Sequence, residues 1–217
     1  MNDPRDETAL RQAIVRIMRL MEQRGLNRGT SGNVSVRHGE GILVTPSGVA
    51  PDELTAEGVV FVDAAGASPA GSLKPSSEWR MHAGLYARRP DVGAVVHCHA
   101  RHATILACAG KTIPSLHYMV GVSGRPMVPL APYRTFGTVE LADAVAEAMD
   151  GGYACLMANH GLIAAAPRLE RALAIAEEME EQAAVYCGTL AIGGPTLLSD
   201  AQMAEVMQQF KGYGQAN

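Results

Sequence analysis

Three histidines stand at positions from which they could hold one metal ion. His97 and His99 lie two residues apart at the end of the apolar run 94–96. Residues two apart in a strand point to the same face, so the two imidazoles are expected to project together. His160 follows a second apolar run, 155–158, and precedes a glycine. Three neutral imidazoles leave one coordination position open, which is typical of catalytic rather than structural zinc.

Each of these histidines also has a purely structural interpretation. A lone His-x-His pair is more often a polar strand edge than a ligand pair, and a single histidine in a turn is usually just hydrogen-bonded. It is the combination of the three that favours a metal site. His82, on a helix face, and His102 and His117 are expected to be structural.

Glu78 is the candidate acid/base. We expect it in the first turn of a helix that opens at Ser76 or Ser77 and runs to about Arg89, before Pro90. A carboxylate there is favoured by the helix dipole without any catalytic role. Alternatively, it moves protons and completes the metal coordination when substrate is absent. Periodicity does not choose between these two interpretations.

Loops of small polar residues offer a candidate anion site. Free backbone N–H groups at a helix start, together with small hydroxyl groups, can form a phosphate cradle without a lysine. Each loop alone is an ordinary turn, and none is a Walker or dinucleotide motif. The candidate residues are Thr30, Asn33, Ser47, Gly48, Ser76 and Ser77.

The elements that must position these residues alternate between helix and strand. Several of the strands are joined by tight turns, which favours a layered α/β domain with a mixed or antiparallel sheet over a purely parallel one. A length of 217 residues fits a single domain, 1–217. Helices are expected over 10–21, 76–89, 103–109, 139–149, 169–190 and 201–210, and strands over 34–37, 42–45, 59–62, 93–99, 127–128, 153–157 and 162–165.

Charge and hydropathy exclude some classes of partner. The net charge of −4 argues against a non-specific nucleic-acid binder, which needs a basic face. No apolar stretch approaches the roughly 20 residues that cross a bilayer, and the acidic N-terminus is unlike a signal peptide. The four cysteines are widely spaced, which suits reduced thiols in a cytoplasmic protein. We therefore expect no nucleic acid or membrane as partner.

Blocks spread over the chain resemble the class II aldolase/adducin family. Within that family they are most similar to the aldolases that act on L-fuculose 1-phosphate and on the related 5-deoxyribulose and 5-methylthioribulose 1-phosphates. The resemblance extends from about residue 10 to residue 213. The blocks are 29–35 (GTSGNVS), 45–48 (TPSG), 75–79 (PSSEW), 97–99 (HCH), 131–133 (APY), 135–138 (TFGT) and 159–161 (NHG).

The resemblance implies a fold, a cofactor and an assembly. The fold would be a three-layer αβα domain with a mixed, largely antiparallel sheet, assembled as a homotetramer with the active site at a subunit interface. His97, His99 and His160 would bind Zn²⁺, with Mn²⁺, Fe²⁺ or Co²⁺ as alternatives. Glu78 would be the acid/base and an alternate metal ligand. The six loop residues named above would hold the substrate phosphate.

The resemblance also implies a reaction. A ketose 1-phosphate would be cleaved reversibly to dihydroxyacetone phosphate and an aldehyde. The candidates are L-fuculose 1-phosphate, which gives lactaldehyde, and the two ribulose derivatives. Tyr118 matches a tyrosine that reaches a neighbouring subunit's site, and Phe136 and Tyr213 match residues of the substrate region. The structural interpretation of Tyr118 and Tyr213 is interface packing.

Other functions remain open at this point. The 4-epimerases of the family break the same bond but tend to carry aspartate where this chain has Glu78. The sugar-acid phosphate decarboxylases and a methylthioribulose-1-phosphate dehydratase use a similar metal site, so the histidines do not exclude them. A non-enzymatic, adducin-like binding module is the alternative from another class. The presence of His97, His99, His160 and Glu78 together argues against it.

Overall fold

A central sheet of seven strands organises the structure, a computed structural model that describes residues 6–210 and 212. The strand order is β3-β2-β1-β4-β7-β6-β5, and only β5 and β6 pair in parallel. The prediction of a mixed, largely antiparallel sheet is therefore confirmed. The strands are β1 (Asn33–His38), β2 (Gly41–Val44), β3 (Val60–Val62), β4 (Ala94–Cys98), β5 (Leu130–Ala131), β6 (Ala154–Met157) and β7 (Gly161–Ala166).

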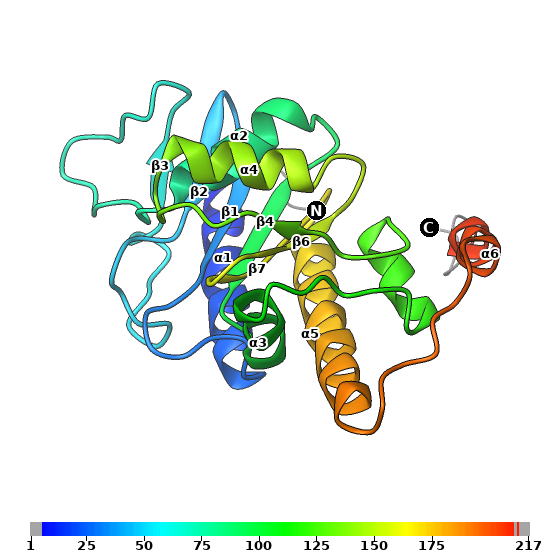
Figure 1. The fold of residues 1–217 in the computed structure, drawn as a ribbon. Helices are drawn as coiled ribbons and strands as arrows, with labels where there is room; N and C mark the ends of the chain where they lie inside the picture. The colour runs from blue at the N-terminus through cyan, green and yellow to red at the C-terminus, as the bar shows by residue number, and fades with distance from the viewer. Residues whose placement is uncertain (1–5, 211, 213–217) are drawn as a thin grey trace.

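Helices cover both faces of this sheet, as Figure 1 shows. Helices α1 (Glu7–Gln23), α3 (Arg101–Cys108) and α5 (Leu169–Ala191) cover one face, and α2 (Trp79–Arg88) and α4 (Val139–Ala148) cover the other. Neighbouring residues of β4 serve different cores: Val96 packs under the first group of helices and Val95 under the second. Because both faces are covered, β4 is buried along its whole length instead of alternating between buried and exposed residues. The three-layer αβα prediction is confirmed.

Local sequence explains where helices α1 and α4 begin. Asp6 caps α1 by accepting a hydrogen bond from the backbone N–H of Thr8. Apolar residues at helical spacing then place Ile14, Met18 and Met21 against the sheet. Thr138 caps α4 in the same way through the N–H of Leu141.

A smaller subassembly lies beyond the main layers. The 3₁₀ helix η1 (Tyr118–Ser123) and the last helix, α6 (Asp200–Phe210), pack against each other, and α6 stands apart from the sheet in Figure 1. No sequence pattern predicted η1. Within the part of the chain that the structure describes, every helix is too short or too polar to cross a membrane.

Two predicted element boundaries were wrong. Helix α2 begins at Trp79, not at Ser76 or Ser77, because the N–H of Ser76 bonds to the carbonyl of Thr45 and keeps this segment extended. Glu78 is therefore the N-cap residue and does not lie in the first turn. The strand predicted at 127–128 is only a bridge between Val128 and Ile113, whose backbone groups bond to each other. The regular strand there is β5.

Candidate metal centre and active site

Neighbouring strands and one turn bring the three histidines together. His97 lies on β4, where it pairs with Asn33 of β1 and with Ile163 of β7. His160 stands in the turn between β6 and β7. The ring centroids of His97, His99 and His160 are 4.8 to 5.1 Å apart, and their ligand nitrogens all lie within 4.8 Å of one another. The predicted meeting of the three histidines is confirmed.

Backbone geometry in this turn aims His160 at the other two histidines. Asn159, with φ 55°, is the single non-glycine residue of the described chain in the left-handed region. Gly161 then brings β7 against the end of β4, and a Cβ atom on Gly161 would lie 2.5 Å from the carbonyl oxygen of Cys98. Only glycine permits this approach, which places His160 beside His97 and His99.

The hydrogen bonds of His97 leave one nitrogen lone pair facing the site. Its Nδ1–H donates to the carbonyl of Leu162 at 2.9 Å, so Nε2 carries the lone pair. His97 Nε2 lies 3.1 Å from His99 Nε2 and 3.3 Å from Glu78 Oε2. Nitrogens bound tetrahedrally to zinc at about 2.0–2.1 Å stand roughly 3.3 Å apart. The 3.1 Å between the Nε2 atoms of His97 and His99 is close to that value.

Glu78 supplies a further test of the metal fit. Its side chain is buried, and Oε2 accepts a hydrogen bond from Asn33 Nδ2 at 2.9 Å. Oε1 lies 3.2 Å from His160 Nε2 but has no hydrogen bond of regular geometry within the described residues. A buried carboxylate oxygen without a donor is costly unless a cation meets it. The donor set of three imidazoles and one carboxylate therefore fits a divalent metal ion.

Burial and neighbouring charges shift the pKa values of the side chains at the site. Burial raises the pKa of Glu78, but the adjacent His97 and His160 outweigh it, so the net pKa is well below the usual range. Burial lowers the pKa of His97, and Glu78 more than reverses this, so its pKa is raised. His99 lies at the open rim of the site, yet the protein around its ring and the charges of His97 and His160 lower its pKa to about 4. At neutral pH the imidazole of His99 is thus uncharged and able to bind a metal ion, and Glu78 is ionised.

The candidate anion loops lie beside Glu78. The N–H of Ser47 donates to the carbonyl of Lys74, and the N–H of Ser76 donates to that of Thr45, both at 2.9 Å. These bonds align the loop at 45–48 with the segment at 74–77. Ser76 is buried, and its Oγ accepts from the N–H of Glu78 at 3.3 Å. Ser47, Gly48 and Ser77 are exposed along the same edge, and Thr30 lies in the exposed turn before Asn33.

The three aromatic candidates have different outcomes. A Cβ atom on Gly137 would lie 2.8 Å from the carbonyl oxygen of Ser77, so the Phe136 loop packs directly on the segment at 74–77. Phe136 is 65% exposed at that edge. Tyr118 is half exposed in η1 and stacks on Phe210, with ring centroids 6.4 Å apart. None of the contacts described for Tyr118 joins it to His97, His99 or His160 of its own chain. Tyr213 lies outside the described residues.

Sequence reasoning missed one group near the site. His82 was interpreted as merely structural, but it is completely buried and lies 2.6 Å from the side-chain oxygen of Asn33. The available signal was its spacing of four residues from Glu78, which places two side chains on one side of a helical segment.

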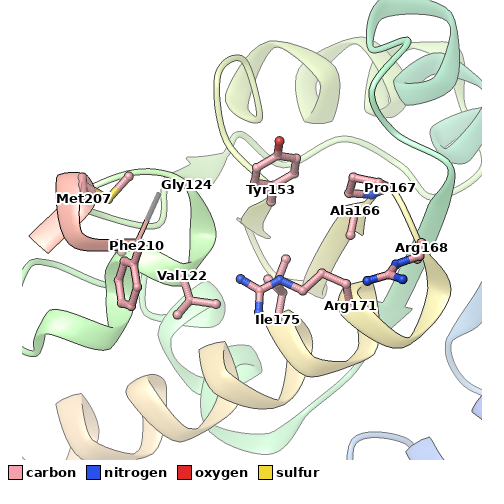
Figure 2. A pocket seen from close by; sticks show the side chains of 11 residues that line it. Val122, Gly124, Tyr153, Ala166, Pro167, Arg168, Arg171, Ile175, Met207 and Phe210 are labelled. Atoms are coloured by element: carbon pink, nitrogen blue, oxygen red, sulfur yellow. The ribbon is translucent and has the colours of Figure 1, made fainter. Parts of the chain in front are cut away.

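A pocket of about 630 Å³ lies away from this site. Figure 2 shows it between Met207 and Phe210 of α6 on one side and Arg168 and Arg171 at the start of α5 on the other. It reaches the Ala166 end of β7, which is opposite to the end that carries the histidines. Cavity size therefore does not locate the candidate active site; the chemistry of the side chains does.

Comparisons with known proteins agree with this fold. Residues 12–187 match the class II aldolase and adducin N-terminal domain. The chain is 46% identical to a 5-methylthioribulose-1-phosphate/5-deoxyribulose-1-phosphate aldolase of Rhodospirillum rubrum, covering 97% of this chain and 95% of that protein. It is 48% identical to the L-fuculose phosphate aldolase of Escherichia coli K12, covering 89% of this chain and 90% of that protein.

A solved structure gives the same result. An L-fuculose 1-phosphate aldolase superposes with a TM-score of 0.91 and 37% sequence identity, covering 97% of this chain and 98% of that one. With a layered fold of this kind and histidines that could hold a metal, the chain belongs to the class II aldolase and adducin family.

Proposed function

We propose that this protein is a zinc-dependent aldolase that reversibly cleaves a ketose 1-phosphate into dihydroxyacetone phosphate and an aldehyde. The observation that carries the proposal is the cluster of three imidazoles, two of which adjoin the buried carboxylate of Glu78, whose Oε1 has no hydrogen bond of regular geometry among the described residues. The names of the two relatives, both aldolases of such sugar phosphates, support it.

The residues of the site divide into three roles. His97, His99 and His160 hold the cation, with Glu78 as an additional ligand when no substrate is bound. The bound cation supplies a Lewis acid that polarises the oxygens of the substrate. Glu78 moves a proton to or from the carbon beside the carbonyl of dihydroxyacetone phosphate. The phosphate is bound by the loop residues Thr30, Asn33, Ser47, Gly48, Ser76 and Ser77.

Tyr118 acts in a neighbouring subunit under this proposal. It is half exposed and makes no described contact with the three metal-site histidines of its own chain, which suits a residue that serves another copy. In a homotetramer it would exchange a proton with the aldehyde oxygen, with Phe136 and Tyr213 lining the same substrate region. We further propose a single domain, 1–217, that works in the cytoplasm.

The aldehyde half of the substrate is the least constrained part. The loops beside Glu78 contact only the phosphate side, so they do not distinguish L-fuculose 1-phosphate from 5-deoxyribulose or 5-methylthioribulose 1-phosphate. The relatives above include aldolases named for both kinds of substrate. The ratio of kcat/KM values on the two kinds of substrate is the measurement that separates them.

The test uses the zinc-loaded protein with L-fuculose 1-phosphate and, separately, 5-methylthioribulose 1-phosphate. Release of dihydroxyacetone phosphate is followed with a coupled reductase, with and without chelator. We expect chelator-sensitive release that is nearly abolished in His99→Ala and Glu78→Gln. His38→Ala is the matched control. His38 is the last residue of β1, away from the site, and its partly exposed side chain pairs only weakly with Glu7 of α1.

Two results would overturn parts of the proposal. Bound zinc without release from either substrate would exclude the aldolase and favour the epimerase, dehydratase or decarboxylase reactions of the same family. Failure to bind any divalent ion, tested by metal analysis after zinc addition, would exclude the enzyme altogether. An adducin-like binding module would then be the better interpretation.

A further inference from the structure

A series of buried hydrogen bonds connects helix α2 to Glu78 through Asn33. Asn33 Nδ2 donates to Glu78 Oε2 at 2.9 Å, and Asn33 Oδ1 lies 2.6 Å from His82 Nε2. On the other side of its ring, His82 Nδ1 lies 2.7 Å from Ser35 Oγ, which is 2.8 Å from the hydroxyl of Tyr86. All five side chains are buried. Polar groups in such a place are stable only when each one has its partner.

The carboxylate determines the direction of every bond in the series. An ionised carboxylate only accepts, so the amide nitrogen of Asn33 must face Glu78 and the amide oxygen must face His82. The amide oxygen also only accepts, so His82 must carry its proton on Nε2. His82 Nδ1 is then an acceptor, to which Ser35 donates. A single tautomer of His82 fits the contacts.

We infer that His82 is a positioning residue, which holds the Asn33 amide in the orientation that donates to Glu78 and thereby orients the carboxylate. Without the N–H of His82, the buried amide oxygen of Asn33 has lost its donor and the amide is held by Glu78 alone, so it can rotate and its hydrogen bond to the carboxylate is weakened. The inference rests on the proposed role of Glu78 as acid/base, since only then does its orientation affect turnover.

The surroundings of His82 keep it in the required neutral form. Burial lowers the pKa of His82 to about 3, with a further contribution from the charge of His97. Asn33 also pairs with His97 across β1 and β4. A displaced Asn33 would thus affect both the carboxylate and the candidate phosphate loop that Asn33 ends.

The test compares two variants of His82 with one control. His82→Leu removes both ring nitrogens, whereas His82→Gln keeps one donor and one acceptor. Leu85→Ala is the matched control, since Leu85 is buried on the same helix one turn further on and packs in the apolar core beneath α2. It should reduce stability without changing the orientation of Glu78.

The first measurement isolates proton transfer by Glu78. In D₂O, with saturating zinc, dihydroxyacetone phosphate alone exchanges one C–H hydrogen for deuterium. The proton moves to the Glu78 carboxylate, exchanges with solvent and returns as a deuteron, while the bonding pair stays with the substrate. We expect the exchange rate and kcat of the folded protein to fall about 10-fold or more in His82→Leu, with partial recovery in His82→Gln. Leu85→Ala should retain both rates.

The second measurement does not depend on activity. Nitrogen-15 NMR of the metal-free protein should show His82 with an N–H at Nε2 and an acceptor at Nδ1. The side-chain amide signal of Asn33 should shift in His82→Gln. This readout keeps the inference testable even where His82→Leu does not fold.

The outcomes separate the inference from the proposed function. If the wild-type protein neither exchanges nor releases dihydroxyacetone phosphate, the proposed function is wrong, and the NMR signals alone show whether His82 orients Asn33. If the wild type is active, unchanged rates in His82→Leu and His82→Gln would overturn the inference. So would equal rate losses in Leu85→Ala and His82→Leu, or a proton on Nδ1.

Discussion

Gly161 lies where the start of β7 meets the end of β4, and its replacement by alanine should weaken metal binding. The added Cβ atom would lie 2.5 Å from the carbonyl oxygen of Cys98 and 3.1 Å from His99 Cδ2. Such atoms essentially never approach closer than 3.0 Å, so the two strands must separate by the difference of 0.5 Å. His160, the residue before Gly161, would move with β7.

The size of this movement gives the expected effects. Metal–ligand distances must hold within about 0.2 Å, so we expect the Kd for zinc to rise on the order of 10- to 100-fold. Overpacking of this kind costs about 1–3 kcal/mol of unfolding free energy. For a chain of this length, that cost corresponds to a fall in Tm of roughly 2–12 °C.

The assay is a zinc titration against a chromophoric chelator, together with thermal unfolding of the metal-free protein. Gly188→Ala is the control, because Gly188 lies in α5, and a Cβ atom there would meet nothing within 4 Å. That change should leave the Kd unchanged and raise stability by about 0.5–1 kcal/mol. A zinc Kd and a Tm in Gly161→Ala equal to those of the wild type would refute the reasoning.

Three further predictions concern acid, core and metal. Asp91→Asn removes the hydrogen-bonded ion pair with Arg89 that lowers the pKa of Asp91 to about 2 from 3.8. The pKa of Asp91 is lower in the folded than in the unfolded protein. The stability that the ion pair contributes is therefore complete above pH 3.8 and is lost as the pH falls towards 2. With 45% of the Asp91 side chain exposed, urea unfolding at pH 7 should show a loss of about 1 kcal/mol or less, which shrinks below pH 4. Leu43→Ala, at a fully buried position, should cost about 2–5 kcal/mol in the same assay, whereas the half-exposed Leu73→Ala should change stability by less than about 0.5 kcal/mol. Chelation should lower the wild-type Tm, because zinc present at 100 times its Kd contributes about 2.7 kcal/mol to the free energy of unfolding. The Tm of His99→Ala should stay unchanged on chelation. Equal shifts of Tm in both proteins would contradict the metal site.

Local patterns were sufficient for most of the secondary structure. The helical spacing of Ile14, Met18 and Met21 predicted α1, and the apolar run before His97 predicted β4. These elements can be predicted because the apolar residues of one helix face or of one buried strand follow each other within a short stretch of sequence. The predictions were wrong where a hydrogen bond to a residue distant in sequence determines the local backbone conformation. Ser76 stays extended because it bonds to Thr45, and Val128 leaves the sheet because it bonds to Ile113.

The sequence by itself determined which residues could do the chemistry at the candidate site. The His-x-His spacing at the end of a predicted strand indicated that His97 and His99 share a face, and the sequence at 159–161 offered a third histidine beside a glycine. From these features alone, a metal site was a sound expectation. The family blocks added the roles of Glu78 and the anion loops.

Only the tertiary structure decided how these groups meet. The order of β1, β4 and β7 places Asn33 opposite His97, and the turn at Asn159 and Gly161 aims His160 at the pair. The direction of the hydrogen bonds from His82 through Asn33 to Glu78 depends on two elements that are far apart in sequence, β1 and the start of α2. Sequence spacing constrains side chains within one helix or strand, whereas contacts between elements depend on the packing of the whole sheet, which no local pattern records.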